Sequence, residues 1–399
     1  MGLRERLQHL YLVGQTGVGK STLLENLIIR DIEQGSGVGF LDPHGSSAER
    51  ILDAIPRCRI ADVIYFDATD MDFPIGINPL ATDQEPQLVA SNLVSALKSI
   101  WSESWSDSRL QHLLYHSIAA LAECENTTLL GVRRLLMEPG YRAWVLRQVK
   151  DPVITQFWAE EFTQVWDRRY RADAIAAVQN RLGQLVSRPV IRNVIGQVRD
   201  SVKIGEVMDS GKILIINLRK GRIGEQSANF LGSLIVTQFQ LAAMARKEGS
   251  REFFLHIDEF SNFGTTGFAS ILSEARKYGL GLTLAHQFTQ QIPDATREAI
   301  FGNVGSMIAF RCGYDDAEIL ERQFGREYPA ARLVELGNYH VLARVRAASG
   351  FSPAVMGHTL PPIERSCGHA ERIKARSRRH YAVPREEVEN QIERWMGGQ

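Results

Sequence analysis

The sequence has little of what marks secreted, disulfide-bonded or membrane-spanning proteins. Its 399 residues include only four cysteines, which lie far apart and form no CxxC pair. This excludes a zinc ribbon and predicts free thiols in a reducing compartment. No run of about 18 apolar residues is present, and the first ten residues lack the apolar core of a signal peptide. The chain is therefore expected to be soluble and cytoplasmic.

An excess of charge of either sign is also missing. The 46 basic and 46 acidic residues give a formal net charge of zero, so overall charge argues neither for nor against a nucleic-acid partner. Only local basic patches can address that question. The hydrophobic content of 44% is enough for one large core, with or without a second, smaller unit.

A complete phosphate-binding motif stands almost at the start of the chain. Residues 14–21, GQTGVGKS, match GxxxxGK[ST], between an apolar run at 10–13 and an amphipathic helical pattern. In this strand–loop–helix context the backbone N–H groups surround phosphates, Lys20 reaches the terminal phosphates and Ser21 reaches Mg²⁺. A chance glycine-rich turn would not fill every motif position. The predicted nucleotide-binding residues are Gly14, Gln15, Thr16, Gly17, Val18, Gly19, Lys20, Ser21 and Thr22.

A second part of a phosphate site follows much later. Residues 252–260, EFFLHIDEF, give an apolar strand that ends in two carboxylates. Asp258 is expected to hold Mg²⁺ and Glu259 to polarise the attacking water. Two acids at an ordinary strand exit are the alternative, which the phosphate motif disfavours. No NKxD base-reading motif of small GTPases is present, so we expect a motor-type ATPase.

Two further polar residues are candidates for the same site. The apolar strand 280–286 ends at Gln287, which could touch the γ-phosphate or the attacking water, or could simply be a solvated strand end. The preceding helical segment, 268–279, carries Arg276 close to its end. That arginine either stabilises the helix dipole or acts as an arginine finger for a neighbouring subunit.

The order of the remaining elements predicts an α/β fold with an insertion. Strand-like runs at 37–41, 62–67, 212–218 and 304–311 alternate with helices, which indicates a mostly parallel sheet covered on both faces. The segment from 86 to 206 is helical in pattern and carries five of the six tryptophans: Trp101, Trp105, Trp144, Trp158 and Trp166. We expect a nucleotide-binding motor domain at 1–85 and 207–360, an all-α domain at 86–206, and a basic C-terminal tail with a short helix at 361–399.

Within the helical segment, one pair of histidines and one basic stretch require interpretation. His112 and His116 have the i, i+4 spacing of metal ligands, but the glutamate of HExxH is missing and a packed helix is favoured. Residues 168–203 hold eight Arg or Lys against two acids, and 365–379 hold a second basic run. Each could follow a phosphate backbone or be a solvated face, and the second could be a disordered tail.

Several motifs in a fixed order resemble one family. They are FLDPHG at 40–45, INPL at 77–80, GKILIINLRKGRIGE at 211–225, IDEFSNF at 257–263, ILSEARKYGLGLTLAHQ at 271–287 and FGNVGSMIAFRCGYDDAEIL at 301–320. Together with the P-loop they resemble the TraG/TraD-type coupling proteins of conjugation and type IV secretion, within the FtsK–HerA superfamily of hexameric translocases. The resemblance covers roughly residues 8–360.

The resemblance implies an ATPase with a RecA-like domain, using ATP and Mg²⁺, that assembles as a homo-hexamer and pumps DNA, single-stranded during transfer. The implied partners are a relaxase or other substrate protein and a membrane secretion channel. The site residues it supports are Lys20, Ser21, Asp258, Glu259 and Gln287, with Arg276 acting in trans. It leaves open whether Asp42 and His44 line the site or only end a strand.

The resemblance also raises an expectation about what precedes the P-loop. Family members carry N-terminal membrane helices, whereas the P-loop strand here begins at about residue 10. The chain is then either a soluble portion or a soluble relative held at the inner face of the membrane by partners. Two functions compete with DNA pumping: a motor that delivers protein substrates without contacting DNA, and a non-enzymatic nucleotide switch, against which Glu259 argues.

Overall fold

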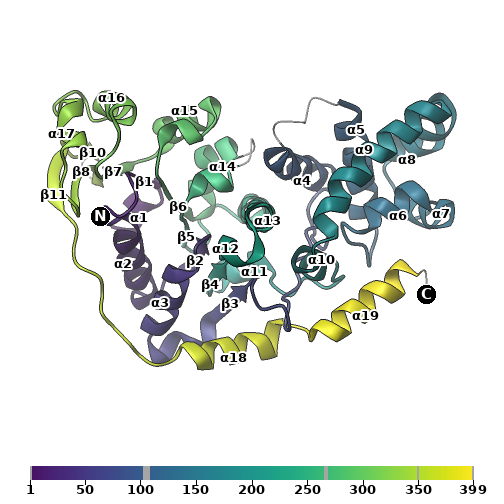
Figure 1. Cartoon of the computed structure of the whole chain (residues 1–399), viewed down its shortest axis with the longest axis horizontal. Helices are drawn as coiled ribbons and strands as arrows, with labels where there is room; N and C mark the ends of the chain where they lie inside the picture. The colour runs from purple at the N-terminus through teal and green to yellow at the C-terminus, as the bar shows by residue number, and fades with distance from the viewer. Residues whose placement is uncertain (1, 102–107, 265–267, 348–349, 398–399) are drawn as a thin grey trace. The chain divides into compact units, whose positions relative to one another are not determined.

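The computed structural model describes residues 2–101, 108–264, 268–347 and 350–397 and divides into two compact units (Figure 1). The first, which we call the sheet unit, comprises Met1–Phe66, Ile204–Arg219 and Ala242–Ser377. The second, the helical unit, comprises Asp67–Lys203, Lys220–Leu241 and Arg378–Gln399. Each unit is therefore assembled from three separate stretches of sequence.

The sheet unit is built on a nine-stranded sheet in the order β11-β8-β7-β1-β6-β5-β2-β4-β3. The strands are β1 (Leu10–Val13), β2 (Gly37–Asp42), β3 (Val63–Asp67), β4 (Ile213–Asn217), β5 (Phe253–Ile257), β6 (Leu280–His286), β7 (Ser306–Ala309), β8 (His340–Arg344) and β11 (Val355–His358). Strands β7, β1, β6, β5, β2 and β4 pair in parallel, and β8 and β11 add antiparallel pairs at one edge. A separate hairpin joins β9 (Arg346–Ala347) and β10 (Gly350–Phe351). The mostly parallel sheet confirms the predicted α/β class.

The strand order decides which side chains meet. Strand β6 lies between β1, which leads into the phosphate loop, and β5, which leads into the acidic pair. Because these strands are parallel, their carboxyl ends share one edge of the sheet. We call it the carboxyl edge. Neighbouring strands are about 4.8 Å apart, so a side chain at the end of β6 can reach both neighbours.

Alternation along the strands buries both faces of the sheet. Leu10 and Leu12 of β1 join a buried cluster with residues of α2 and α3, while Tyr11 between them points to the other face. There the Tyr11 ring contacts Phe301 of α15 at a centroid distance of 5.9 Å. The residues of β1 to β7 are nearly all buried, as expected for parallel strands with helices on both faces, whereas the edge strand β11 is exposed along its length.

The helices of the sheet unit are mostly short. They are α1 (Leu3–Arg6), α2 (Lys20–Glu33), α3 (Ser46–Ala54), α11 (Ile204–Asp209), α14 (Phe268–Glu274), α15 (Asp294–Asn303), α16 (Tyr314–Gln323) and α17 (Ala330–Val334), with 3₁₀ turns at Arg57–Asp62, Phe260–Asn262, Ala275–Tyr278 and Thr289–Gln291. The segment predicted as one helix at 268–279 is thus α14 followed by a 3₁₀ turn. Gly279 ends it with a φ of 73°, as a glycine C-cap does.

The helical unit is built from α4 (Pro86–Ile100), α5 (Ser108–Ala122), α6 (Gly131–Met137), α7 (Pro139–Leu146), α8 (Pro152–Gln156), a π-helix (Phe157–Val165), α9 (Arg168–Val186), α10 (Pro189–Ile195), α12 (Lys220–Ile223) and α19 (Arg385–Met396). Aromatic rings form part of its core. Trp158 is fully buried, contacts Phe157 and Phe162, and donates from its indole nitrogen to the carbonyl of His116 at 3.3 Å. Trp166 packs on the same rings, and Trp105 lies outside the described residues.

The C-terminal segment is helical in the structure, so the interpretation as a disordered tail is wrong. Helix α18 (Ala370–Tyr381) begins in the sheet unit, where Ile373 is fully buried and the Ser377 hydroxyl accepts the backbone N–H of Tyr65 at 2.9 Å. In the helical unit, α19 buries Val388 and Ile392. An amphipathic helix ending the chain was predicted, and α19 confirms it.

One helix within the described residues is long and apolar enough to cross a membrane. It is α13 (Glu225–Ala245), and 72% of its most apolar stretch is buried inside the structure. That burial is typical of a core helix.

Candidate functional site

The phosphate loop joins β1 to α2 through three glycines with positive φ. Gly14, Gly17 and Gly19 have φ angles of 155°, 79° and 111°. At Gly14 a Cβ atom would lie 2.6 Å from the Cβ of Phe310, so no other residue fits there. The Lys20 amine, at the start of α2, donates to the carbonyls of Gly14 at 2.5 Å and Gln15 at 2.9 Å. The predicted loop is thus formed, with its lysine folded back onto it.

The acidic pair stands where β5 ends. Asp258 is 4% exposed, and its backbone N–H donates to the carbonyl of Leu41 at 3.2 Å. Burial, together with the carboxylates of Glu259 and Asp42, raises the pKa of Asp258 to about 7. Glu259 takes a left-handed backbone conformation, with φ and ψ both 48°, which is uncommon for a non-glycine residue and is found at functional sites.

Gln287 links the phosphate loop to the acidic pair. Its Nε2 donates to Oε1 of Glu259 at 2.6 Å, and its Oε1 accepts the Thr16 hydroxyl at 2.8 Å. The side chain can do so because β6 lies between β1 and β5. The structure therefore brings together Thr16, Gln287 and Glu259 in one hydrogen-bonded chain, and the prediction that Gln287 belongs to the site has a geometric basis.

The charges at the carboxyl edge suit a divalent cation beside phosphates. Lys20 is close enough to Asp258 and Glu259 for their carboxylates to oppose the fall in its pKa that burial causes. A buried carboxylate whose pKa is raised by two neighbouring acids would be stabilised as the anion by a cation. Oxygen ligands such as Ser21 and Asp258 are those that Mg²⁺ prefers. Within the described residues no three His, Cys, Asp or Glu side chains are grouped as a metal site.

Asp42 has a role that the sequence left open. Its Oδ1 accepts the backbone N–H of His44 and its Oδ2 that of Ala48, each at 2.8 Å, so the carboxylate caps α3. It also adds negative charge near Asp258, because β2 pairs with β5. His44 is exposed and lies just beyond the strand end. Asp42 therefore both ends its strand and contributes to the electrostatics of the site.

Arg276 is not at the carboxyl edge. It lies in the 3₁₀ turn that precedes β6, and its side chain is exposed. Strand β6 runs for seven residues from that point to Gln287. At about 3.3 Å per residue the arginine is therefore roughly 20 Å from the phosphate loop of its own chain. Any contact with a nucleotide would have to be made in a second subunit.

Two residues next to the phosphate loop were missed in the sequence. Arg311 follows β7 and donates to Oε1 of Gln15 at 3.4 Å and to Oδ1 of Asn338 at 3.0 Å. Tyr339 precedes β8 and donates its backbone N–H to the carbonyl of Val18 at 2.8 Å. Arg311 had a usable signal, since it ends the strand-like run 304–311 of the predicted parallel sheet. Tyr339 had none, because its position depends on an antiparallel edge strand.

Of the histidine pair of α5, His116 is buried in the aromatic core and His112 lies at its exposed edge. His116 stacks on Phe157 with ring centroids 4.0 Å apart, and burial and the nearby His112 lower its pKa to about 4. His112 contacts Glu161 at 3.1 Å. No third ligand completes a metal site among the described residues. The stacking of His116 is that of a packed core histidine, in line with the packed-helix interpretation.

Many basic side chains of the two basic stretches form hydrogen bonds or ion pairs within the protein. In the first basic stretch Arg171 donates to the carbonyl of Phe162 at 3.1 Å, and Arg188 to the Ser227 hydroxyl at 3.0 Å. In the second, Lys374 pairs with Glu49, Arg378 with Asp70 and Arg365 with Glu33. Arg168 and Arg169 are exposed at the start of α9.

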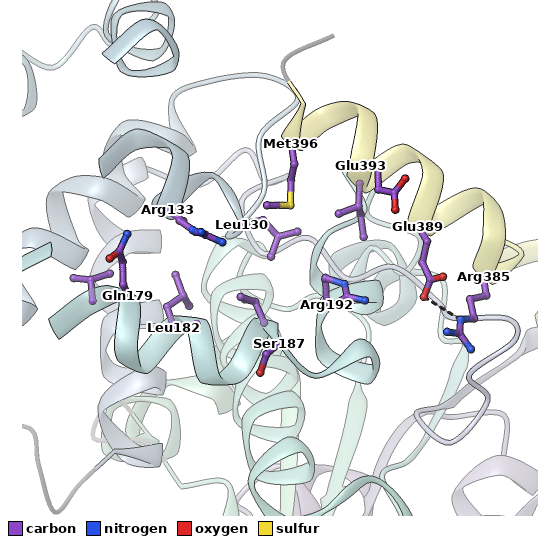
Figure 2. Close-up of a pocket in the computed structure, with 14 residues that line it drawn as sticks. Leu130, Arg133, Gln179, Leu182, Ser187, Arg192, Arg385, Glu389, Glu393 and Met396 are labelled. Carbon is purple, nitrogen blue, oxygen red and sulfur yellow. Dashed lines mark hydrogen bonds and ion pairs between the residues drawn. The ribbon is translucent and has the colours of Figure 1, made fainter. Parts of the chain in front are cut away.

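The helical unit has a cavity of its own, of about 760 Å³ (Figure 2). Leu182 of α9 and Met396 of α19 contribute apolar lining, and Arg192 and Glu389 are among its polar groups. Glu389 accepts from Arg385 at 2.9 Å and from Asn193 at 3.1 Å. None of the predicted site residues lines this cavity.

Comparison with known proteins gives a fold. No family model and no curated protein matches the chain. The unbound form of the bacterial conjugative coupling protein TrwBdeltaN70 is 15% identical, with 91% of this chain and 88% of that chain covered and a TM-score of 0.61. TrwB bound to the ATP analogue ADPNP is 16% identical over the same shares, with a TM-score of 0.63. VirB4 of Thermoanaerobacter pseudethanolicus is 14% identical, with shares of 88% and 89% and a TM-score of 0.51. Over nearly its whole length the chain has the P-loop fold of the TrwB coupling protein.

Proposed function

We propose that this chain is an ATP-hydrolysing motor that recruits DNA or nucleoprotein and pumps it toward a conjugation or type IV secretion channel. The observation that carries the proposal is the carboxyl edge of the sheet, where Lys20, Asp258, Glu259 and Gln287 meet at the phosphate loop. The fold shared with TrwB, for which complexes with ADP and Mg²⁺, an ATP analogue and a GTP analogue are known, supports it.

Binding of the phosphates begins with the loop. The positive-φ glycines let backbone N–H groups point at the phosphates, and the first turn of α2 adds its dipole. Lys20 leaves the carbonyls of Gly14 and Gln15 and turns to the terminal phosphates. Ser21 and Asp258 would hold Mg²⁺, which neutralises charge on the phosphate oxygens when bound.

Hydrolysis then depends on Glu259. Its carboxylate orients a water for attack and accepts a proton from it. In the structure that carboxylate is engaged by Gln287, which also binds Thr16 of the loop. A terminal phosphate would compete for the Gln287 amide, so nucleotide binding releases Glu259 and moves Gln287. The position of the Gln287 side chain, at the end of β6, therefore depends on whether a terminal phosphate is bound.

The DNA partner, the ring and the location are further parts of the proposal. Exposed Arg168 and Arg169 at the start of α9 are the residues of the first basic stretch that we assign to phosphate-backbone contact. Arg276 would complete the site of the next subunit in a homo-hexamer. The protein would act in the cytoplasm at the inner face of the membrane, next to a relaxase or other substrate protein.

The test is the ATPase rate with and without single- and double-stranded DNA across a salt series, together with the particle mass. We expect an oligomer whose turnover is stimulated by DNA, with stimulation that declines as salt rises. In an Arg168→Ala/Arg169→Ala variant, the ATPase rate without DNA should be unchanged and the stimulation of that rate by DNA should fall. If the ATPase rate is unchanged by DNA and no DNA binding is detected at any salt concentration, the proposal of a DNA motor is contradicted.

A second candidate is delivery of protein substrates without contact to DNA. The cavity of the helical unit favours it, because an apolar pocket with charged groups around it suits an apolar side chain of a protein partner. A cargo protein that crosslinks at Gln179, but not in a Leu182→Arg variant, while no DNA is retained, would support this function. Crosslinking unaffected by Leu182→Arg would count against it.

A further inference from the structure

An aromatic ring lies directly on the phosphate loop. A Cβ atom at Gly19 would be 2.7 Å from Cδ1 of Tyr339, so the ring occupies the space beside that glycine. The backbone N–H of Tyr339 also donates to the carbonyl of Val18 at 2.8 Å. The tyrosine is thus attached to the loop through both its backbone and its ring.

The backbone of Tyr339 is held in an unfavourable conformation. Its φ is 66°, in the left-handed region that a bulky residue rarely adopts. The Tyr339 carbonyl accepts the N–H of Thr359 at 2.8 Å, and Arg311 ties the preceding Asn338 to Gln15 of the loop. Surrounding contacts therefore hold the ring at this position, as is common for residues that contact ligands.

The ring is not there to fill the core. Tyr339 is 43% exposed, and its neighbours on the paired strands β8 and β11 are two exposed imidazoles. The ring of His358 is 6.3 Å from that of Tyr339 and 4.7 Å from that of His340, between centroids. An exposed group of three rings thus adjoins a phosphate-binding loop.

We propose that Tyr339, with His358 beside it, is the stacking surface for the base of the nucleotide whose phosphates the loop binds. The inference rests on the proposed nucleotide binding and adds the base site to it. Every nucleobase offers a flat π-face to an aromatic ring, and a phenol ring selects little between them. The site should therefore accept adenine and guanine nucleotides alike.

The experiment compares ligands with and without a base. Calorimetry measures binding of ATP, GTP and inorganic tripolyphosphate to the full chain and to three variants. Tyr339→Asn removes the ring but suits the left-handed backbone, Tyr339→Phe keeps the ring, and Tyr314→Asn alters another exposed tyrosine, 61% exposed, at the start of α16. A Tyr339→Gly variant replaces Tyr339→Asn if the latter does not fold.

The expected result is a loss confined to ligands that carry a base. Tyr339→Asn should weaken ATP and GTP by about 5- to 100-fold and leave tripolyphosphate unchanged. Tyr339→Phe should restore the affinity for both nucleotides, and Tyr314→Asn should match the unmodified protein.

Other results overturn the inference in distinguishable ways. Equal weakening of ATP and tripolyphosphate would mean that Tyr339 only supports the loop, and unchanged ATP binding would mean that no base stacks there. If the unmodified protein binds tripolyphosphate as tightly as ATP, the proposed base site is contradicted and the phosphate site is retained. Protein that binds neither would overturn the proposed function and this inference with it.

Discussion

The carboxyl edge of the sheet unit and the core of the helical unit place polar groups and aromatic rings in opposite ways. At the carboxyl edge, buried charges such as Lys20 and Asp258 face one another, and a glutamine joins loop and acid. In the helical unit, Phe157, Trp158 and Trp166 pack together, and even His116 lies stacked among them.

The difference shows what each region is able to do. A buried acid whose pKa is raised, as at Asp258, is costly for stability and is retained where chemistry needs it. The aromatic core of the helical unit carries no such cost, and the unit has a cavity and exposed basic residues. The proposed function accordingly places catalysis in the sheet unit and partner recognition in the helical unit, and substitutions should separate the two.

Removing the charge at the phosphate loop should have the largest effect on turnover. Lys20→Ala removes the amine that neutralises the terminal phosphates, so we expect no detectable hydrolysis. Phosphate release measured against Lys98→Ala, an exposed lysine in α4, provides the control. Turnover that survives Lys20→Ala would show that the site is elsewhere.

Removing the distant arginine should be almost as severe. Arg276→Ala is expected to lower turnover by about 10³-fold or more, the range of arginine fingers, with nucleotide binding unchanged. Mixing it with Glu259→Gln subunits that keep Arg276 should return part of the activity. Neighbouring Lys277→Ala is the matched control. No recovery in any mixture would contradict a role in trans.

The helical unit should respond in stability rather than in chemistry. Trp158→Ala leaves a large void in a fully buried site and should cost about 3–5 kcal/mol of unfolding free energy. Urea unfolding followed by circular dichroism measures it, with the 37% exposed Trp144→Ala as a mild comparison. Nucleotide binding by folded Trp158→Ala protein should be normal; if it is lost, the two units are not separable in this way.

Lowering the pH should produce the smallest effect, a loss of stability to which buried histidines of both units contribute. Burial lowers the pKa of His9 from 6.5 to about 4, while its Nδ1 accepts the N–H of Leu282 at 3.1 Å. Below pH 6.5 the unfolded chain binds a proton that the folded chain refuses, so stability falls as pH drops from about 6.5 to 4. The pKa of His116 in the helical unit is also lowered, so its protonation destabilises the folded state in the same way.

The variant that tests the acid effect is His9→Asn, because asparagine suits the left-handed backbone of His9, whose φ is 66°. Between pH 7 and 5 the melting temperature of the unmodified protein should change by a few degrees in the destabilising direction relative to that of the variant, because the opposing protonation of Asp258 is common to both. An equal fall in both would remove His9 from the explanation.

The sequence allowed prediction of those features that depend on local pattern. The P-loop, the acidic strand end and Gln287 each follow a recognisable strand, and parallel pairing then brings their ends together. Tyr339 could not be predicted, since an antiparallel edge strand positions it. For the helical unit, only the all-α class could be predicted from the sequence. The partners of Trp158 depend on packing between helices, which the periodicity of the sequence does not specify. The sequence left open whether the second basic run is ordered, because Ile373 is a lone buried apolar anchor in a strongly basic stretch.

The location of Arg276 also constrains symmetry. The phosphate loop and Arg276 stand at opposite ends of the parallel strands. The proposed action of Arg276 in trans therefore requires that one subunit offer its amino edge to the carboxyl edge of the next. Such a contact is heterologous, joining two different surfaces. A two-fold dimer would pair like with like and leave both nucleotide sites without an arginine. Only a head-to-tail arrangement that closes on itself gives every site its partner, so activity should appear cooperatively with ring closure rather than with dimerisation.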